Sequence, residues 1–388
     1  MGYVNYREYL TENILPFWQK AVDHEYGGIM TQVDENGEVF CEDKNVWFLG
    51  RTMWSYAMAY NTVEKRPEYL DVCEEMFRFF EKCERPSGKL PFTVKRDGTL
   101  ISEREQYCYS EAFAVMGLAQ YYKACGREEV WEKANHYFDI IMRMYKASAN
   151  SNQNIHTSVP AKTFGLHMAM LATAQFIRNV GRDTEKYDEL ARMAVEEMMT
   201  GGYVDDERKV VIEYVTPDKK YLDGDEGNEF CPGHIYEAAW FVLCEGEVKN
   251  DDKIRLFGKK LCDYAMQKGF EEKCKLIPTV ADIEKYPFGN PQATCIWWPQ
   301  CEAFIAYRLA HNIFGDEMYA KHAERIEKTA FEVFSDADGA EWYCESDSKG
   351  NIVDNNKGSI LKGPFHIPRV LLALISLEET GNILKYMK

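Results

Sequence analysis

The stretch Val-Trp-Phe-Leu-Gly-Arg-Thr-Met-Trp, residues 46–54, decides the fold, because its apolar residues lie on nearly every face of the helix that their spacing predicts. A helix of this kind must be covered by protein on both sides. A second such stretch is Ile-Trp-Trp-Pro-Gln, residues 296–300. The chain therefore contains helices that lie between two layers of protein, and each carries a few polar side chains in apolar surroundings.

Apolar residues recur at intervals of three and four in about twelve segments, each bounded by Gly, Pro, Asn or Asp. Every second segment is apolar on nearly all faces, whereas the others carry a polar stripe and are predicted to lie at the surface. The predicted helices are 3–20, 45–61, 67–83, 106–125, 128–145, 163–181, 184–200, 233–247, 251–268, 296–314, 316–334 and 364–379.

The connections between these helices also alternate. After a striped helix the chain passes through segments typical of β-hairpins, as in 28–37, 90–98 and 342–350, whereas the next connection is short, as in 124–127. Long loops at one rim and tight turns at the other predict an all-α (α/α)6 barrel, formed as one domain over residues 1–388. The rival architecture, an open helical solenoid, requires a sharper repeat and polar terminal caps, and the sequence contains neither.

Composition and charge exclude several classes of function. A hydrophobic content of 46% suffices for a large core, and a net charge of −17 argues against nucleic acid or an anionic membrane as partner. The sequence has no transmembrane stretch and no signal-peptide segment, so we expect a cytoplasmic protein. Its twelve cysteines lack metal-binding spacing and are expected to be reduced core thiols.

Two of the eight histidines stand at predicted starts of inner helices. They lie in Cys-Pro-Gly-His-Ile-Tyr-Glu, residues 231–237, and Gly-Pro-Phe-His-Ile-Pro-Arg, residues 363–369, each with a charged residue three positions on and on the same helix face. The starts of all inner helices point to the rim with the long loops, so both histidines should face one pocket. Because histidine titrates near neutrality, such a pair can take a proton from one side of a carbon atom and return it to the other.

Other inner-helix starts carry polar or aromatic residues in apolar surroundings. A single buried charge is most often a satisfied structural group. Several helices that bring such residues to the same rim favour a binding pocket instead. Besides the two histidines, the candidates are Trp47, Arg51, Tyr107, Tyr109, Glu111, Glu237, Trp297, Trp298, Gln300, Glu302 and Arg369.

Taken together, these residues resemble the N-acylglucosamine 2-epimerases, a family that includes the renin-binding proteins and is related to the cellobiose 2-epimerases. The similar motifs follow one another in order and span essentially the whole chain. They are residues 15–18, 24–28, 46–51, 232–240, 297–303 and 362–369.

The resemblance implies an (α/α)6 barrel that inverts C2 of an aldose, typically interconverting N-acetylglucosamine and N-acetylmannosamine. In this chemistry an opened sugar exposes an aldehyde, one base removes the C2 proton to give an enediolate, and an acid on the opposite face returns a proton. By resemblance His234 and His366 form this pair. Arg51 is expected to stabilise charge on the C1 oxygen, and Glu237 and Glu302 to orient the imidazoles. Substrate contacts are predicted for Trp47, Tyr107, Glu111, His156, Trp298, Gln300 and Arg369.

Three alternatives remain at this point. Residues 152–156, Asn-Gln-Asn-Ile-His, resemble the disaccharide epimerases more than the acylglucosamine branch, so the substrate is mannose, glucose or a β-linked disaccharide in the first alternative. The second is an inverting glycoside hydrolase with Glu111, Glu237 and Glu302 as its carboxylates. The third is a non-catalytic binding protein. A hydrolase has no need of two inward imidazoles, and binding alone does not require an acid, a base and an oxyanion-stabilising arginine.

No phosphate-binding loop, dinucleotide fingerprint or metal motif occurs in the sequence, so we expect no required cofactor and no metal. Nucleotides activate animal members of the family, but the sequence does not support ATP as an allosteric effector here. The expected partner is a small sugar, and the resemblance is compatible with a homodimer assembled through outer helices.

Overall fold

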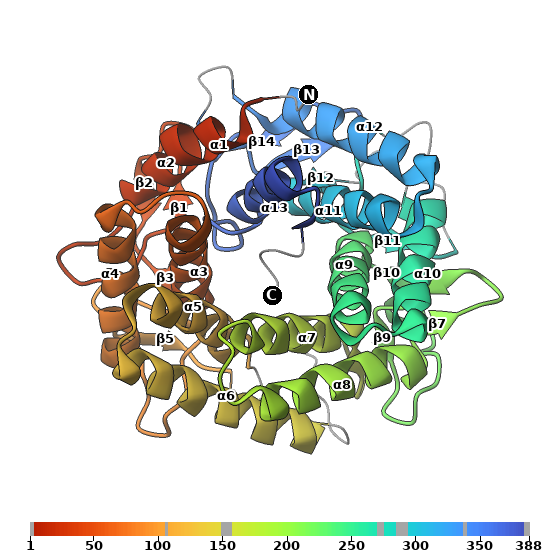
Figure 1. Ribbon diagram of the computed structural model, residues 1–388, viewed down its shortest axis with the longest axis horizontal. Helices are drawn as coiled ribbons and strands as arrows, with labels where there is room; N and C mark the ends of the chain where they lie inside the picture. Colours follow the sequence, from red (N-terminus) through yellow and green to blue (C-terminus); the bar gives the residue numbers. More distant parts are fainter. Residues whose placement is uncertain are drawn as a thin grey trace.

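The computed structural model describes residues 4–104, 108–148, 157–269, 275–284, 294–336 and 340–383. Its helices form two concentric rings around a common axis (Figure 1). The inner ring consists of α3 (Trp47–Thr62), α5 (Tyr109–Cys125), α7 (Phe164–Arg178), α9 (Pro232–Lys249), α11 (Trp297–Phe314) and α13 (His366–Thr380). The outer ring consists of α1 (Tyr6–Glu8), η1 (Tyr9–Ile14) and α2 (Leu15–Gln19), which follow one another directly, and of α4 (Pro67–Cys83), α6 (Glu128–Ser148), α8 (Thr184–Thr200), α10 (Asp252–Gly269) and α12 (Glu317–Phe334). The predicted (α/α)6 barrel is therefore confirmed.

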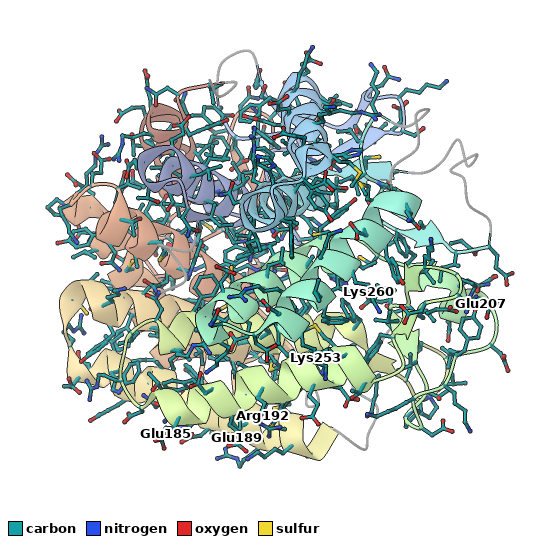
Figure 2. The ribbon with its side chains drawn as sticks, turned by 45° about the vertical axis from the view of Figure 1, so that its right-hand side comes forward. Glu185, Glu189, Arg192, Glu207, Lys253 and Lys260 are labelled. Atoms are coloured by element: carbon teal, nitrogen blue, oxygen red, sulfur yellow. The ribbon has the colours of Figure 1, made fainter. Side chains whose placement is uncertain are left out.

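The two rings differ in burial as the sequence predicts. In α7 every residue from Phe164 to Ile177 is buried, because the helix packs against neighbours on all sides. Outer helices bury one face only, and charged residues such as Glu185 and Arg192 on α8 and Lys253 on α10 extend into solvent (Figure 2). The all-round apolar stretches thus fold into the inner wall of the barrel.

The ring closes where the first helices pack beside α12 (Figure 1). The rings of Tyr9 in η1 and Phe331 in α12 have their centroids 5.8 Å apart, and the Tyr9 hydroxyl donates to the carbonyl of Ala340 at 3.1 Å. The hydroxyl of Tyr6 in α1 donates to the carboxylate of Glu327, which is also in α12. These contacts join the two ends of the chain, which an open solenoid would leave apart.

Within the inner ring, α3 and α5 approach at Gly50 and Gly117 until their backbones touch. A Cβ atom at Gly50 would lie 2.2 Å from the carbonyl carbon of Phe113, and one at Gly117 would lie 2.5 Å from the oxygen of Gly50. Only hydrogen fits at either position. This contact fixes the relative position of the two helices that carry Arg51 and Phe113.

A Gly50→Ala substitution should therefore lower the free energy of unfolding by about 1–3 kcal/mol, because the added methyl group overpacks the contact. The direction of this change is informative, because alanine in a helix interior otherwise raises the free energy of unfolding by roughly 1 kcal/mol relative to glycine. Denaturant unfolding followed by circular dichroism measures the change, and Gly50→Val should cost more than Gly50→Ala. An alanine variant as stable as the parent would contradict this packing.

Short antiparallel strands occupy the loops at the rim where the inner helices begin. Hairpins form at the three predicted places and at a fourth. They are β1 (Gln32–Val33) with β2 (Val39–Cys41), β4 (Thr93–Val94) with β5 (Leu100–Ser102), β7 (Val204–Asp205) with β8 (Val210–Val211), and β13 (Glu345–Asp347) with β14 (Ile352–Asp354).

Further strand pairs connect loops that precede different inner helices. They are β3 (Lys44–Asn45) with β4, β6 (Lys162–Thr163) with β9 (Tyr214–Val215), β10 (Glu229–Phe230) with β11 (Ala281–Asp282), and β12 (Thr294–Ile296) with β13. A short helix, η2 (Asp225–Asn228), precedes β10. The joined loops form a collar around the mouth of the barrel. None of the described helices combines the length and the apolarity that a membrane crossing requires.

Candidate active site

A cavity of about 470 Å³ opens within the collar, at the N-terminal ends of the inner helices. Its volume is in the range of small-molecule sites. All six inner helices contribute to its wall. Of the residues predicted from the sequence, those that line it are Trp47, Arg51, Tyr109, His234, Glu237, Trp297, Trp298, His366 and Arg369.

His366 begins α13 and is held by a carboxylate from α11. Its Nδ1 atom lies 2.8 Å from Oε1 of Glu302, whose other oxygen accepts a hydrogen bond from Nε1 of Trp240 at 2.9 Å. Arg369, one turn further along α13, contacts Oε1 of Glu302 at 2.7 Å and pairs with Glu237 on α9. Arg369 also lies 3.2 Å from Nδ1, but the Glu302 contact is shorter. Because a carboxylate that pairs with a guanidinium accepts hydrogen bonds, we assign the proton to Nδ1, which leaves the lone pair on Nε2.

Burial and the positive charges of Arg369 and Arg51 lower the pKa of His366 well below its usual value. The imidazole is therefore neutral at physiological pH. A neutral imidazole with its Nε2 lone pair available can accept a proton, which is the requirement for a base.

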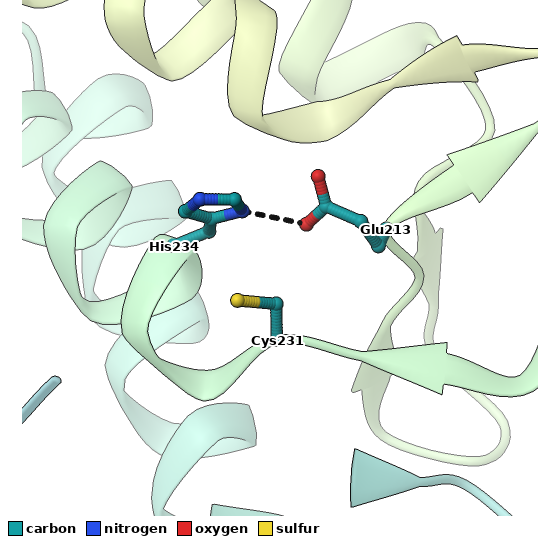
Figure 3. A group of neighbouring side chains, drawn as sticks. All are labelled: Glu213, Cys231 and His234. Atoms are coloured by element: carbon teal, nitrogen blue, oxygen red, sulfur yellow. Dashed lines mark hydrogen bonds and ion pairs between the residues drawn. The ribbon is translucent and has the colours of Figure 1, made fainter. Parts of the chain in front are cut away.

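His234 lies in the first turn of α9, and 34% of its side-chain surface is exposed where it lines the cavity. Its Nδ1 atom lies 3.0 Å from Oε2 of Glu213, which comes from the segment between β8 and β9 (Figure 3). The other oxygen of Glu213 accepts from the Thr163 hydroxyl at 2.7 Å and the Gly165 N–H at 3.2 Å. Burial opposes ionisation, but His234 and these two donors lower the pKa of Glu213, so its carboxylate is charged.

The electrostatic surroundings of His234 are opposite to those of His366. Burial disfavours the imidazolium, but the neighbouring Cys231 sulfur and the Glu213 carboxylate raise the pKa of His234 well above its usual value. The surroundings thus favour the protonated form of His234 and the neutral form of His366. Environments that separate two pKa values in this way are typical of an acid and a base that act together.

The indole of Trp298 contacts both imidazoles. Its ring centroid is 5.5 Å from that of His234 and 5.4 Å from that of His366, with interplanar angles of 34° and 32°. The indole also lines the cavity. It therefore offers a flat apolar surface within reach of both imidazoles.

Arg51 projects from α3 into a cage of aromatic rings. Its guanidinium carbon lies 4.0 Å from the centroid of the Phe113 ring, and 4.8 Å from those of Trp47 and Phe365. Cation–π contacts of this kind hold a positive charge in a fixed place. Since Arg51 also lines the cavity, it can stabilise negative charge that develops on a bound oxygen.

Four of the predicted site residues are not seen at the cavity: two lie behind its wall, and two lie outside the described residues. Gln300 does not line the cavity, because its amide bonds the N–H of Ile277 at 2.9 Å and the carbonyl of Ile277 at 2.6 Å. Glu111 is also fully buried behind the wall, where it accepts from the N–H of Leu90 at 3.0 Å. Both side chains hold loop backbone. Tyr107 and His156 lie outside the described residues.

The two glutamates that were expected to orient the imidazoles also differ in placement. Glu302 contacts His366, as expected. Glu237 lines the cavity but forms its ion pair with Arg369 rather than with an imidazole. Its charge therefore balances a buried guanidinium.

Sequence reasoning missed Glu213, the partner of His234. The signal was present: Glu213 is the single charged residue in Val-Val-Ile-Glu-Tyr-Val, residues 210–215, a stretch typical of a buried strand. Buried charge is costly unless it is paired or functional. A charged residue in an apolar loop segment, and not only one at a helix start, is therefore a candidate site residue.

The chain matches the family described as N-acylglucosamine 2-epimerase (GlcNAc 2-epimerase) over residues 27–363. The N-acylglucosamine 2-epimerase of Rattus norvegicus is 25% identical over 383 residues, with 93% of this chain and 88% of the relative covered. The cellobiose 2-epimerase of Eubacterium cellulosolvens is 24% identical over 400 residues, covering 94% and 96%. The structure of cellobiose 2-epimerase from Bacillus thermoamylovorans B4167 has the same fold, with a TM-score of 0.81, 20% identity and coverage of 96% and 98%. The chain therefore belongs to the N-acylglucosamine 2-epimerase family and is a carbohydrate 2-epimerase, an isomerase.

Proposed function

We propose that the protein interconverts N-acetylglucosamine and N-acetylmannosamine by moving the C2 proton of the open-chain sugar. One observation carries this proposal: two imidazoles, from α9 and α13, line the same cavity and both contact the indole of Trp298. The substrate follows the N-acylglucosamine 2-epimerases, which match this chain over 93% of its length.

In the proposed reaction, the neutral Nε2 of His366 takes the C2 proton. The electrons of the broken C2–H bond form the C1–C2 double bond of an enolate that keeps the acetamido group on C2, and the negative charge moves to the C1 oxygen, where Arg51 stabilises it. His234 then donates its proton to the opposite face of C2, and the C1 aldehyde forms again. The sugar leaves with inverted configuration, His366 has gained a proton and His234 has lost one, so exchange with solvent restores the starting enzyme.

A substrate panel tests the choice of sugar. The purified protein is incubated separately with N-acetylmannosamine, N-acetylglucosamine, mannose, glucose and cellobiose, and products are separated by chromatography. We expect kcat/KM to be highest for the two N-acetyl sugars. Conversion of cellobiose alone would replace the proposed substrate with a disaccharide, and release of glucose from cellobiose would indicate hydrolysis.

We further propose that side chains alone carry the reaction, without a metal, a redox cofactor or ATP. The acid, the base and the cation that the chemistry requires are supplied by His234, His366 and Arg51. Dialysis against a chelator and addition of ATP should each leave kcat unchanged. The eleven free cysteines among the described residues support a reducing, cytoplasmic setting, and light scattering tests the homodimer that the family resemblance allows.

A further inference from the structure

We propose, building on this epimerase function, that Glu213 is a positioning residue that keeps His234 the protonated member of the pair in the resting enzyme. His366 then begins the reaction as the base.

Glu213 is fixed by its backbone as well as by its side chain. Its carbonyl accepts from the N–H of Phe164 at 2.8 Å, and its N–H donates to the carbonyl of Glu229 at 3.2 Å. The side chain is only 3% exposed and reaches the start of α7 through Thr163 and Gly165. The Glu213 carboxylate is therefore a rigid reference point for the imidazole that contacts it.

Gly165 allows α7 to approach this pair. A Cβ atom there would lie 3.0 Å from Nδ1 of His234 and 3.1 Å from Oε1 of Glu213. These distances are tighter than most contacts of real Cβ atoms, so a side chain at this position would press on both groups. The start of α7 thus packs closely against the same imidazole nitrogen that contacts Glu213.

The two histidine–carboxylate pairs differ in the positive charge that surrounds them. Glu302, at His366, shares Arg369 with Glu237, at 2.7 Å from Glu302, and Arg51 adds a second positive charge that acts on His366, so guanidinium charges already offset the carboxylates there. Among the described residues, no lysine or arginine forms an ion pair with Glu213. An imidazolium at position 234 is the cation that balances this buried carboxylate, which favours the proton on His234 over His366.

The remaining titratable neighbours of His234 do not reverse this preference. Cys231 precedes α9 and lies beside the pair (Figure 3), where it also favours the imidazolium. Glu229 of β10 is close enough to interact with both members, but burial and the charge of Glu213 raise its pKa, which lessens its charge. His366 is neutral across the cavity, and Trp298 carries no charge.

These two protonation states determine the form of the pH profile of kcat/KM. For the epimer whose C2 hydrogen faces His366, the competent free enzyme has His366 neutral and His234 protonated. It is lost when the pH falls through the depressed pKa of His366 and when the pH rises through the raised pKa of His234. The profile should be a broad bell whose alkaline limb reports His234.

Glu213→Gln tests this directly, because it keeps the size of the side chain and removes its charge. We expect the alkaline limb of kcat/KM to move to lower pH by about 1–3 units, the size of effect that an adjacent charge produces, while the acidic limb stays in place. Proton NMR of the His234 ring in the substrate-free protein should show the same shift in its titration. Thr163→Val, which removes one donor and keeps the charge, should move the limb less.

Glu229→Gln is the matched control, because it removes a neighbouring carboxylate that does not contact the imidazole. In this variant the alkaline limb of the kcat/KM profile should stay at nearly the same pH as in the parent protein. If Glu213→Gln lowers kcat/KM equally at all pH values, with an unchanged His234 titration, Glu213 is structural and the inference is wrong. If the parent protein epimerises no sugar, the proposed function fails, while the NMR titration still reports where the proton lies.

Discussion

His366→Ala and His234→Ala should each lower kcat for epimerisation by about 10²–10⁴-fold, the usual contribution of a general acid or base. Both variants should stay folded. In His366→Ala the Glu302 carboxylate keeps its bonds to Arg369 and Trp240, and in His234→Ala the removed side chain is one-third exposed to the cavity. Steady-state rates with N-acetylmannosamine measure the loss, and thermal melts check the fold.

Hydrogen exchange at C2 should distinguish the loss of one histidine from a complete loss of catalysis. With His234 absent, His366 can still remove the C2 proton and return one to the same face. The His234→Ala variant should therefore exchange C2 hydrogen with solvent without inverting the sugar, and only for the epimer whose C2 hydrogen faces His366. Full epimerase activity in either variant would remove that histidine from the pair.

His167→Ala is the matched control for these variants. This histidine is buried on α7, where its ring nitrogens contact the hydroxyls of Tyr145 at 2.6 Å and Tyr203 at 2.9 Å, and it does not line the cavity. Its removal should lower stability through the lost contacts and leave kcat within a few-fold of the parent. Comparing kcat of His167→Ala with kcat of the other two variants shows whether the loss depends on where the imidazole lies.

Arg369→Met should lower the free energy of unfolding by about 3–5 kcal/mol, because it leaves Glu237 and Glu302 buried without their shared cation. Arg369 is only 3% exposed, so solvent screens these pairs little. The substitution also removes a positive charge that lowers the pKa of His366. The acidic limb of kcat/KM should consequently move to higher pH. Urea unfolding and a pH profile measure the two effects.

Arg178→Met provides the comparison for this second prediction. Arg178 on α7 forms a pair with Glu245 at 2.7 Å, away from the described cavity wall. Its loss should reduce stability without moving either limb of the pH profile. If Arg369→Met were as stable as the parent, the charge network beneath His366 would not have the importance assigned to it.

Much of the fold could be predicted because its signals are local. The apolar positions of residues 46–54 surround one helix and can be recognised without knowing what covers them. Glycine turns likewise indicated the three hairpins at 28–37, 90–98 and 342–350. The pairing of β6 with β9 could not be predicted in this way, because it joins loops far apart in sequence whose alignment depends on the assembled ring.

The placement of the candidate residues agrees with expectation where helical phase was considered and differs from it where helical phase was not considered. His366 and Arg369 are three residues apart and share a face, as expected. Trp298 and Gln300 are two residues apart, as are Tyr109 and Glu111, so the members of each pair point in nearly opposite directions. The aromatic member lines the cavity, and its polar neighbour binds the loop backbone behind the wall.

Proton NMR of N-acetylmannosamine incubated with the protein in deuterated water tests the central claim most directly. The acid that returns the proton exchanges with solvent, so the account predicts N-acetylglucosamine with deuterium at C2, one atom for each inversion, and no such product without the protein. Product that keeps its original C2 hydrogen, or a sugar that shows neither inversion nor exchange, would contradict the two-histidine mechanism.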